Sequence, residues 1–221
     1  MQQATKTIPI AAITDDLLGS GLVNSMARPD GNTTGISILA RELDGKRQDI
    51  LIEAVPGIRR MAFLIDVNYA DARVDALQEA ARARGIEFSI HLVTGSEEIA
   101  AAVESAQASG ATALTTVASP LFYGLRQLII ERSAVARLPT ILLFPEDAEE
   151  GGFAAYGPRN SHVFVELTTQ QVIKLFRGTK VADIPVEQPT KFELWINLKT
   201  AKAMGVTVPE ALLVRADKVI E

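Results

Sequence analysis

The sequence predicts an α/β fold built around a mainly parallel sheet, and two regularities support this prediction. Short apolar runs with the length of a buried strand alternate along the chain with longer segments that carry apolar residues at helical spacing. Glycine follows several helical segments where a helix would end, as at Gly85, Gly110 and Gly178. Repeated strand–helix–strand units place their strands in parallel and cover both faces of the sheet with helices.

The apolar runs give the expected strands. Most are short continuous runs, such as MAFLI within residues 60–65, whereas residues 86–94 alternate between two faces. The face of that segment expected to be buried holds Ile86, Phe88, Ile90 and Leu92. The expected strands are 8–13, 33–38, 60–65, 86–94, 111–117, 140–144, 153–156 and 192–197.

Helical spacing, caps and turn signals give the expected helices. Ser96 supplies a cap, and Glu97 and Glu98 follow it in the first turn, where the helix dipole favours acids. Pro56 and Gly57 stop an earlier helix. The expected helices are 17–27, 39–55, 71–84, 96–109, 121–137, 161–176 and 198–204, with an acidic turn or short helix at 145–150.

The order of these elements predicts one complete lobe and part of another. Residues 37–157 hold enough alternating strands and helices for one parallel-sheet lobe. Residues 1–36 contain too few strands to bury a sheet, so we interpret them as the remnant of an amino-terminal lobe. We expect the helix within 158–183 to return to that lobe, and 184–221 to form a connector and the terminal strand and helix of the carboxy-terminal lobe.

Composition excludes several classes of protein. The 221 residues include no cysteine, which excludes a disulfide scaffold, and the net charge of −5 gives no basic footprint for nucleic acid. No apolar run reaches the length of a membrane span. The polar start of the chain lacks the apolar core of a secretory signal peptide, so the protein would be cytoplasmic if Met1 is the true start.

Several segments resemble one family of bacterial proteins over essentially the whole chain. In the first part these are TKTIPI, GSGLV, ARP and GNTTG, at 5–10, 19–23, 27–29 and 31–35. In the last part they are AAYGP, PVEQPTKFEL, INLKTAKAMG and LVRADKVIE, at 154–158, 185–194, 196–205 and 213–221. Together they resemble the ABC-transporter substrate-binding proteins of the type I periplasmic-binding-protein fold, a group that includes aromatic amino-acid binders.

The resemblance implies a function and a setting. Members bind a small solute, such as an amino acid or a related carboxylate, in a cleft between two lobes without chemistry, and deliver it to an ABC permease in the membrane. They are periplasmic, and they need no cofactor or metal. Against the family pattern this chain starts late, so the first lobe is partial. We expect its exposed strand edge to support a homodimer.

The resemblance and the expected strand ends together indicate a ligand site. In parallel α/β sheets ligands bind beyond the carboxyl ends of the strands. The residues expected there are Asp15, Ser20, Asp66, Asn68, Tyr69, Ser119, Pro120 and Glu146, with Tyr156 at the expected hinge. Asp66 or Asp15 could accept from a ligand ammonium, Ser119 could donate to its carboxylate, and Tyr69 with Phe122 could form an apolar wall.

Each of these residues also has a structural interpretation. Asp66 and Asn68 are common turn residues, and Ser119 with Pro120 could simply begin a helix. Asp15 stands beside Asp16 where the family has proline, which leaves the solute open. The acidic residues of 146–150 are expected to form a solvated helix start.

Other functions have weaker support. Two distant histidines and no cysteine make a catalytic triad hard to build, so we expect no enzyme. GSGLVN at 19–24 matches only part of a dinucleotide fingerprint. The remaining alternatives are a cytosolic effector-sensing module, because the same fold occurs in transcriptional regulators, and a truncated remnant that binds nothing.

Overall fold

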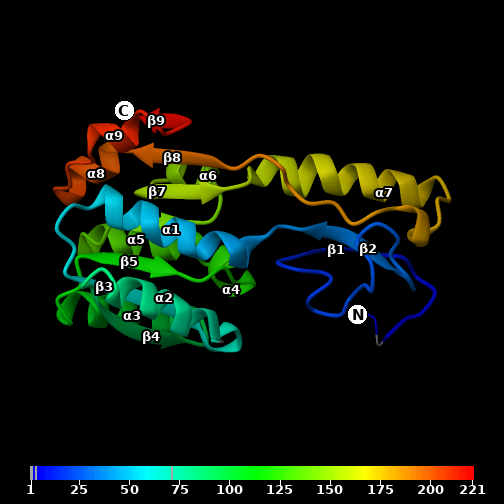
Figure 1. Ribbon diagram of the computed structural model, residues 1–221, viewed down its shortest axis with the longest axis horizontal. Coiled ribbons are helices and arrows are strands. Elements are labelled where there is room, and N and C mark those ends of the chain that lie inside the picture. The colour runs from blue at the N-terminus through cyan, green and yellow to red at the C-terminus, as the bar shows by residue number, and fades with distance from the viewer. Residues whose placement is uncertain (1, 3, 71) are drawn as a thin grey trace. The chain divides into compact units, whose positions relative to one another are not determined.

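The computed structural model describes residues 2, 4–70 and 72–221. The chain divides into two compact units. Unit 1 comprises residues 1–40 and 158–192, and unit 2 comprises residues 41–157 and 193–221. Figure 1 shows the chain coloured from its amino to its carboxyl end. Each unit is described below by itself.

Unit 2 is organised around a mainly parallel sheet. Among the described residues seven strands pair in the order β4-β3-β5-β6-β7-β8-β9, and all neighbours are parallel except β7 and β8. The strands are β3 (Arg60–Asp66), β4 (Glu87–Val93), β5 (Ala113–Thr116), β6 (Thr140–Leu142), β7 (Ala154–Gly157), β8 (Glu193–Asn197) and β9 (Lys218–Ile220). The predicted α/β class with a parallel sheet is confirmed.

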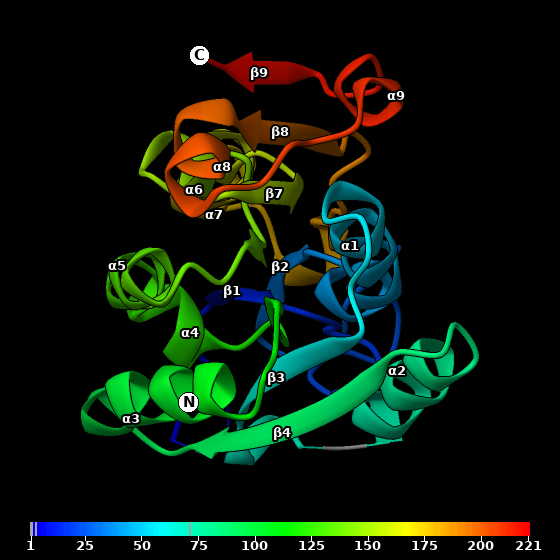
Figure 2. The ribbon, with the colours of Figure 1, turned by 90° about the vertical axis from the view of Figure 1, so that its left-hand side faces the viewer.

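Helices cover both faces of this sheet. Figure 2 shows α3, α4 and α5 on one face and α1 and α2 on the other, as right-handed crossovers require. The helices are α1 (Ala40–Ala54), α2 (Ala72–Arg82), α3 (Ser96–Ala108), α4 (Pro120–Gly124), α5 (Arg126–Ala136), α6 (Glu146–Glu149), α8 (Leu198–Met204) and α9 (Glu210–Leu213). The first residue of the helix expected at 71–84 lies outside the described residues.

The expected helix 121–137 is divided in two. Leu125 separates α4 from α5 with a backbone conformation that is not helical. Ser119 caps the first of these helices, and Arg137 ends the second in the left-handed conformation, at φ 52°. The short helix α4 follows the carboxyl end of β5.

Unit 1 is small and contains a two-stranded parallel sheet. The strands β1 (Ile10–Thr14) and β2 (Thr33–Ser37) pair over five residues. A π-helical turn, η2 (Ser161–Leu167), leads into α7 (Thr168–Phe176), which packs on both strands. The connector that follows contains the 3-10 turn η3 (Val181–Asp183) and binds the outer edge of β2 through Glu187.

The prediction of a helix over 17–27 is wrong. These residues form consecutive turns, in which the carbonyl of Leu17 accepts from the N–H groups of Leu22 and Val23. Gly19 and Gly21 favour this outcome, because glycine lowers helix propensity and Gly21 has a φ of +69°. The segment still buries Leu17 and Val23 in a small core cluster.

The burial expected for the alternating strand is also partly wrong. In β4, Ile90 is 41% exposed and Leu92 is 57% exposed, although both were expected to face the core. Among the described residues β4 is the edge strand of the unit 2 sheet and pairs only with β3, so no further strand packs beside Ile90 and Leu92. Phe88, on the same strand, does pack inward. Its ring lies edge to face against the ring of Phe63, with 4.9 Å between the ring centroids.

Within the described part of the chain, no helix has both the length and the apolar character needed to cross a membrane.

Candidate functional site

The strand order of unit 2 creates a switch point between β3 and β5. The chain leaves β3 to form β4 on one side of it and then returns to form β5 on the other side. The loops that follow β3 and β5 therefore diverge, and in open α/β sheets this divergence leaves a crevice in which ligands bind. Residues 66–69 and 117–120 line the two sides of this point.

The loop after β3 holds three of the predicted site residues. Asp66 ends the strand and is only 2% exposed. Its Oδ1 accepts from the backbone N–H of Asn68 at 3.0 Å and from Asn68 Nδ2 at 3.1 Å, which caps the short turn η1 (Val67–Tyr69). Tyr69 packs partly against the core. The three residues therefore form one ordered loop with a carboxylate at its base.

The loop after β5 holds Ser119 and Pro120. Ser119 is buried, and its Oγ accepts from the N–H of Phe122 at 3.1 Å, so it caps α4. Pro120 occupies the first helical position, where its missing N–H costs nothing. Phe122 is buried in the core. The structural interpretation of these residues holds, and the hydroxyl hydrogen of Ser119 is still a possible donor.

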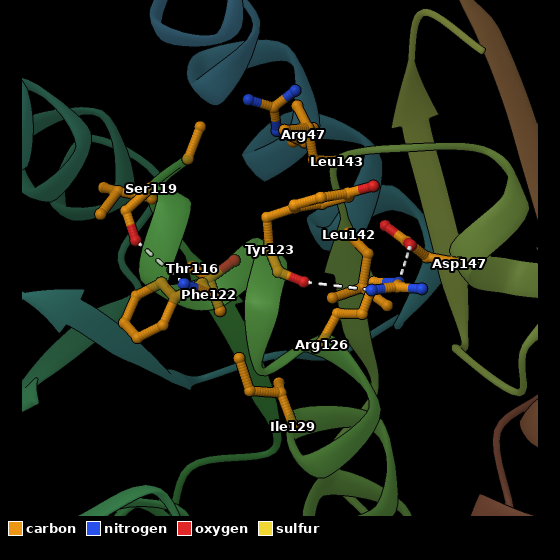
Figure 3. Close-up of a pocket in the computed structure, with 12 residues that line it drawn as sticks. Arg47, Thr116, Ser119, Phe122, Tyr123, Arg126, Ile129, Leu142, Leu143 and Asp147 are labelled. Atoms are coloured by element: carbon orange, nitrogen blue, oxygen red, sulfur yellow. Dashed lines mark hydrogen bonds and ion pairs between the residues drawn. The ribbon is translucent and has the colours of Figure 1, made fainter. Parts of the chain in front are cut away.

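A small cavity of about 30 Å³ lies next to this loop (Figure 3). It has room for a water molecule or two and not for an amino acid. Side chains from α1, from β5 and the loop after it, from α4 and α5, from β6 and the loop after it, and from α6 surround it. The lining residues are Arg47, Thr116, Val117, Ala118, Ser119, Phe122, Tyr123, Arg126, Ile129, Leu142, Leu143 and Asp147.

Among the side chains that line this cavity, Asp147 has the pKa that lies furthest from its ordinary value. It is 3% exposed, its Oδ2 accepts from the N–H of Phe144 at 3.0 Å, and its Oδ1 lies 3.4 Å from Arg126 Nε. Burial raises the pKa of Asp147 to about 7, and the Phe144 hydrogen bond and Arg126 only partly oppose this shift. The expectation of a solvated acidic cluster is therefore wrong for Asp147, which folds inward from the first turn of α6.

Arg126 connects the cavity to the surface. Its Nε and Nη2 donate to the two carboxylate oxygens of Glu150 at 3.1 and 3.3 Å, and this contact raises the pKa of Arg126. The guanidinium also lies 5.1 Å from the ring centre of Tyr123, which packs edge to face on Phe144. Figure 3 shows Arg126 between Tyr123 and Asp147.

Arg47 closes the cavity from α1. It is buried with Asp44, whose Oδ1 lies 2.7 Å from Arg47 Nη2. Arg47 Nη1 also donates to the backbone carbonyl of Tyr156 at 3.2 Å. Tyr156, predicted at the hinge, thus lies on β7 with its main chain held by α1.

The remaining predicted site residues lie elsewhere. Asp15 and Ser20 belong to unit 1, where Asp15 follows β1 and its carbonyl accepts from the N–H of Leu39 at 3.2 Å. Ser20 is exposed and its hydroxyl donates to the carbonyl of Leu17 at 3.3 Å. Glu146 is half-buried in the first turn of α6. A ligand role for these three stays a prediction.

Sequence reasoning missed Arg47, Tyr123, Arg126 and Asp147. Each lies within a segment expected to be helical or acidic, and only packing of distant elements brings them to one cavity. The one available signal was the position of Asp147, which follows the strand β6 closely.

Comparison with known proteins gives consistent results. A family model described as "ABC transporter substrate binding protein" matches residues 1–220. A tyrosine-binding protein of Clostridioides difficile is 24% identical over 214 residues, which are 92% of this chain and 59% of that protein. The chain therefore spans less than two thirds of that curated relative.

Solved structures share the fold. A conserved domain protein of Vibrio cholerae superposes with a TM-score of 0.83 at 23% identity, covering 98% of this chain and 73% of that one. A domain from Streptococcus pneumoniae solved with L-Trp superposes with a TM-score of 0.80 at 24% identity, covering 99% and 74%.

Proposed function

Because the chain belongs to the ABC transporter substrate binding protein family, we propose that it is the solute-binding component of an ABC importer and that it binds an amino acid or a related carboxylate without chemistry. The observation that carries the proposal is the family match over residues 1–220. In the proposed mechanism the solute binds between two lobes outside the cytoplasmic membrane, and contacts to both lobes favour the closed form that a permease receives.

The geometry of unit 2 supports this proposal. An amino acid carries an ammonium group and a carboxylate. Its site therefore needs a carboxylate that accepts from the ammonium group and several hydrogen-bond donors for the ligand carboxylate. Asp66 supplies a buried carboxylate on one side of the switch point, and Ser119 supplies a hydroxyl on the other. We propose that Asp66 receives the ammonium group and that Ser119 donates to the carboxylate.

Aromatic amino acids are the first solutes to test. One relative is named for binding tyrosine, and one structural neighbour was solved with L-Trp. We propose that Tyr69 forms part of the apolar wall for such a side chain, because it is half-buried at the same loop as Asp66. Tyr156, Asp15, Ser20, Pro120 and Glu146 remain proposed site residues.

The proposed role of Asp66 can be tested with matched ligands. Calorimetric titration would compare L-tyrosine with 3-(4-hydroxyphenyl)propionate, which has the same ring and carboxylate but no ammonium group. In Asp66→Asn we expect the affinity for L-tyrosine to fall about tenfold or more, because a hydrogen bond to a charged group contributes about 1.5–3 kcal/mol. The affinity for the propionate should change little.

Asparagine at position 66 keeps the oxygen that caps the η1 turn, so the loop should remain folded. The matched control is Asp75→Asn, which removes the same charge from an exposed position on α2 and should leave both affinities unchanged. An equal loss for both ligands would contradict an ammonium contact at Asp66. Absence of binding by every common amino acid at millimolar concentration would contradict the proposed function.

We also propose that unit 1 supports self-association through β1. Among the described residues β1 pairs only with β2, and unpaired strand edges readily accept another strand. Ile8, just before β1, is exposed as well. A chain that sediments strictly as a monomer at tens of micromolar would contradict this proposal.

A further inference from the structure

The strand β4 presents an unguarded apolar edge. Within the described part of the chain it is the last strand of the unit 2 sheet, and β3 is its one neighbour over seven residues (Figure 2). The N–H and C=O groups that point away from β3 therefore have no ladder partner. Ile90 and Leu92 expose large apolar side chains on the same strand. Natural edge strands are normally protected by charged side chains, proline or a bulge. Over 87–93 β4 has no lysine or proline, and its acidic residue, Glu87, is paired with Arg60 of β3.

Two copies of β4 that pair in antiparallel fashion would bring matching side chains opposite each other. Written around Ile90, the strand reads Phe88, Ser89, Ile90, His91 and Leu92. If two copies pair in antiparallel fashion with Ile90 at the centre, Phe88 of each copy lies opposite the partner's Leu92, and Ile90 lies opposite the partner's Ile90. Side chains directly opposite each other share a face of the sheet, so these apolar groups would meet on one face. On the other face Ser89 would lie opposite the partner's His91. Within one chain these two polar side chains already form a hydrogen bond, Nε2 to Oγ at 3.0 Å, so this face stays polar on pairing.

The charges at the two ends of β4 have opposite signs. Arg82 and Arg84 are exposed at the end of α2, just before the strand, although Arg84 also pairs with Asp49 at 2.9 Å. Glu97 is exposed in the first turn of α3, just after the strand. An antiparallel arrangement brings the basic end of each copy to the acidic end of the other. A parallel arrangement would instead bring like charges together.

We propose that β4 is a homodimer interface at which a second copy of this chain adds its own β4 in antiparallel register about a twofold axis at Ile90. This pairing would join the two seven-stranded sheets into one continuous sheet. It satisfies the free backbone groups, covers Ile90 and Leu92, and matches the charges at both ends. It is distinct from pairing through β1, which lies in unit 1.

Sedimentation equilibrium of the 221-residue chain tests the interface. In Ile90→Lys two ammonium groups would face each other across the axis, so we expect the dimer dissociation constant to rise by at least about tenfold, equivalent to 1.4 kcal/mol. The matched control is Val135→Lys on α5, because Val135 is 81% exposed in the same unit and lies outside the proposed interface. The control should dimerise like the parent chain.

Chemical cross-linking tests the register independently. The chain has no cysteine, so Ile90→Cys introduces a single thiol. Opposite Cβ atoms in an antiparallel pair lie about 4.5–5.5 Å apart, within reach of a short bis-maleimide. We expect Ile90→Cys to give a covalent dimer at micromolar concentration and Val135→Cys to give little.

Three results would overturn the proposal. The first is a parent chain that is monomeric at tens of micromolar, and the second is a dimer whose dissociation constant is unchanged in Ile90→Lys. The third is a cross-linking yield for Ile90→Cys no higher than that for Val135→Cys. Circular dichroism should show that Ile90→Lys folds, as its exposed position leads us to expect.

Discussion

At the scale of single residues, Asp147 has the clearest physical consequence. In the unfolded chain its carboxyl group ionises near the ordinary pKa of 3.8, whereas in the folded chain burial raises the pKa to about 7. Between these two values the folded chain binds more protons than the unfolded chain, so the free energy of unfolding falls as pH rises. The contribution is fully present below about pH 4 and is lost by about pH 7, and three pKa units correspond to about 4 kcal/mol.

Asp147→Asn should remove this part of the pH dependence. Asparagine keeps an oxygen that can accept from the N–H of Phe144 and cannot ionise, so the cost of a buried charge disappears. We expect the variant to be more stable than the parent by about 1–3 kcal/mol at pH 8 and nearly equal to it at pH 4. Urea unfolding at a series of pH values would measure both quantities. A parent and variant with parallel pH profiles would contradict the raised pKa.

Some residues of the candidate site could be predicted from the sequence and others could not. Asp66, Asn68 and Ser119 could be located because each follows a recognisable apolar strand, and strand ends fix where loops lie. The roles of Arg47 and Asp147 could not, because they depend on contacts between segments distant in sequence. Arg47 reaches the carbonyl of Tyr156, which is 109 positions away. Local patterns carry no signal for such a pairing.

At the scale of elements, the backbone at the end of α5 is strained, and a single substitution should relieve this strain. Arg137 occupies the left-handed conformation at the helix end, with a φ of 52°, where glycine is normally preferred. Arg137→Gly should therefore stabilise the protein by about 0.5–1 kcal/mol. The same substitution at Arg132, which is exposed inside the same helix, should destabilise it by about 1 kcal/mol.

Chemical denaturation of the two variants would measure this contrast. Because both changes remove an exposed arginine, a difference in sign isolates the backbone conformation from the lost charge. If both variants were destabilised to the same extent, strain at Arg137 would not be a significant term.

The boundaries of helices and strands could be predicted where the apolar periodicity agreed with the cap and stop residues at the ends. The short helix 198–204 was predicted with its bounds from Gly205, which ends it in the left-handed conformation, and the structure adds Asn197 as its cap. The segment 17–27 was misassigned because apolar spacing suggested a helix, whereas Gly19 and Gly21 direct turns. The exposure of Ile90 and Leu92 was missed because alternation identifies a face of a strand and not its place in the sheet.

At the scale of the whole molecule, the parallel sheet of unit 2 was predictable because each crossover follows a general rule of handedness. The strand order was not, since the switch between β3 and β5 depends on which side of the sheet the chain returns to. The antiparallel pairing of β7 with β8 could not be predicted either, because 35 residues separate the two strands and all of them belong to unit 1. Pairing over such a distance leaves no local pattern.

The two units should also differ in stability, because their cores differ in size. In unit 2 two large clusters of buried side chains flank the sheet. The described part of unit 1 has two small clusters, Leu17 with Val23 and Val186, and Ile36 with Val163 and Leu167. Small cores stabilise weakly, because hydrophobic stabilisation is proportional to the apolar area buried. We therefore expect unit 1 to open more often than unit 2.

Hydrogen exchange followed by mass spectrometry can separate this effect from local burial. Strands β2 and β3 form a matched pair, because nearly all residues of both are buried and both pair in parallel with a neighbour. If local burial alone controlled protection, their amides would exchange at similar rates. We expect the amides of β2 to exchange at least about tenfold faster, because they need only the small unit 1 core to open. Equal protection of β2 and β3 would instead mean that the chain opens as one cooperative body, and a difference in core size could not then explain its dynamics.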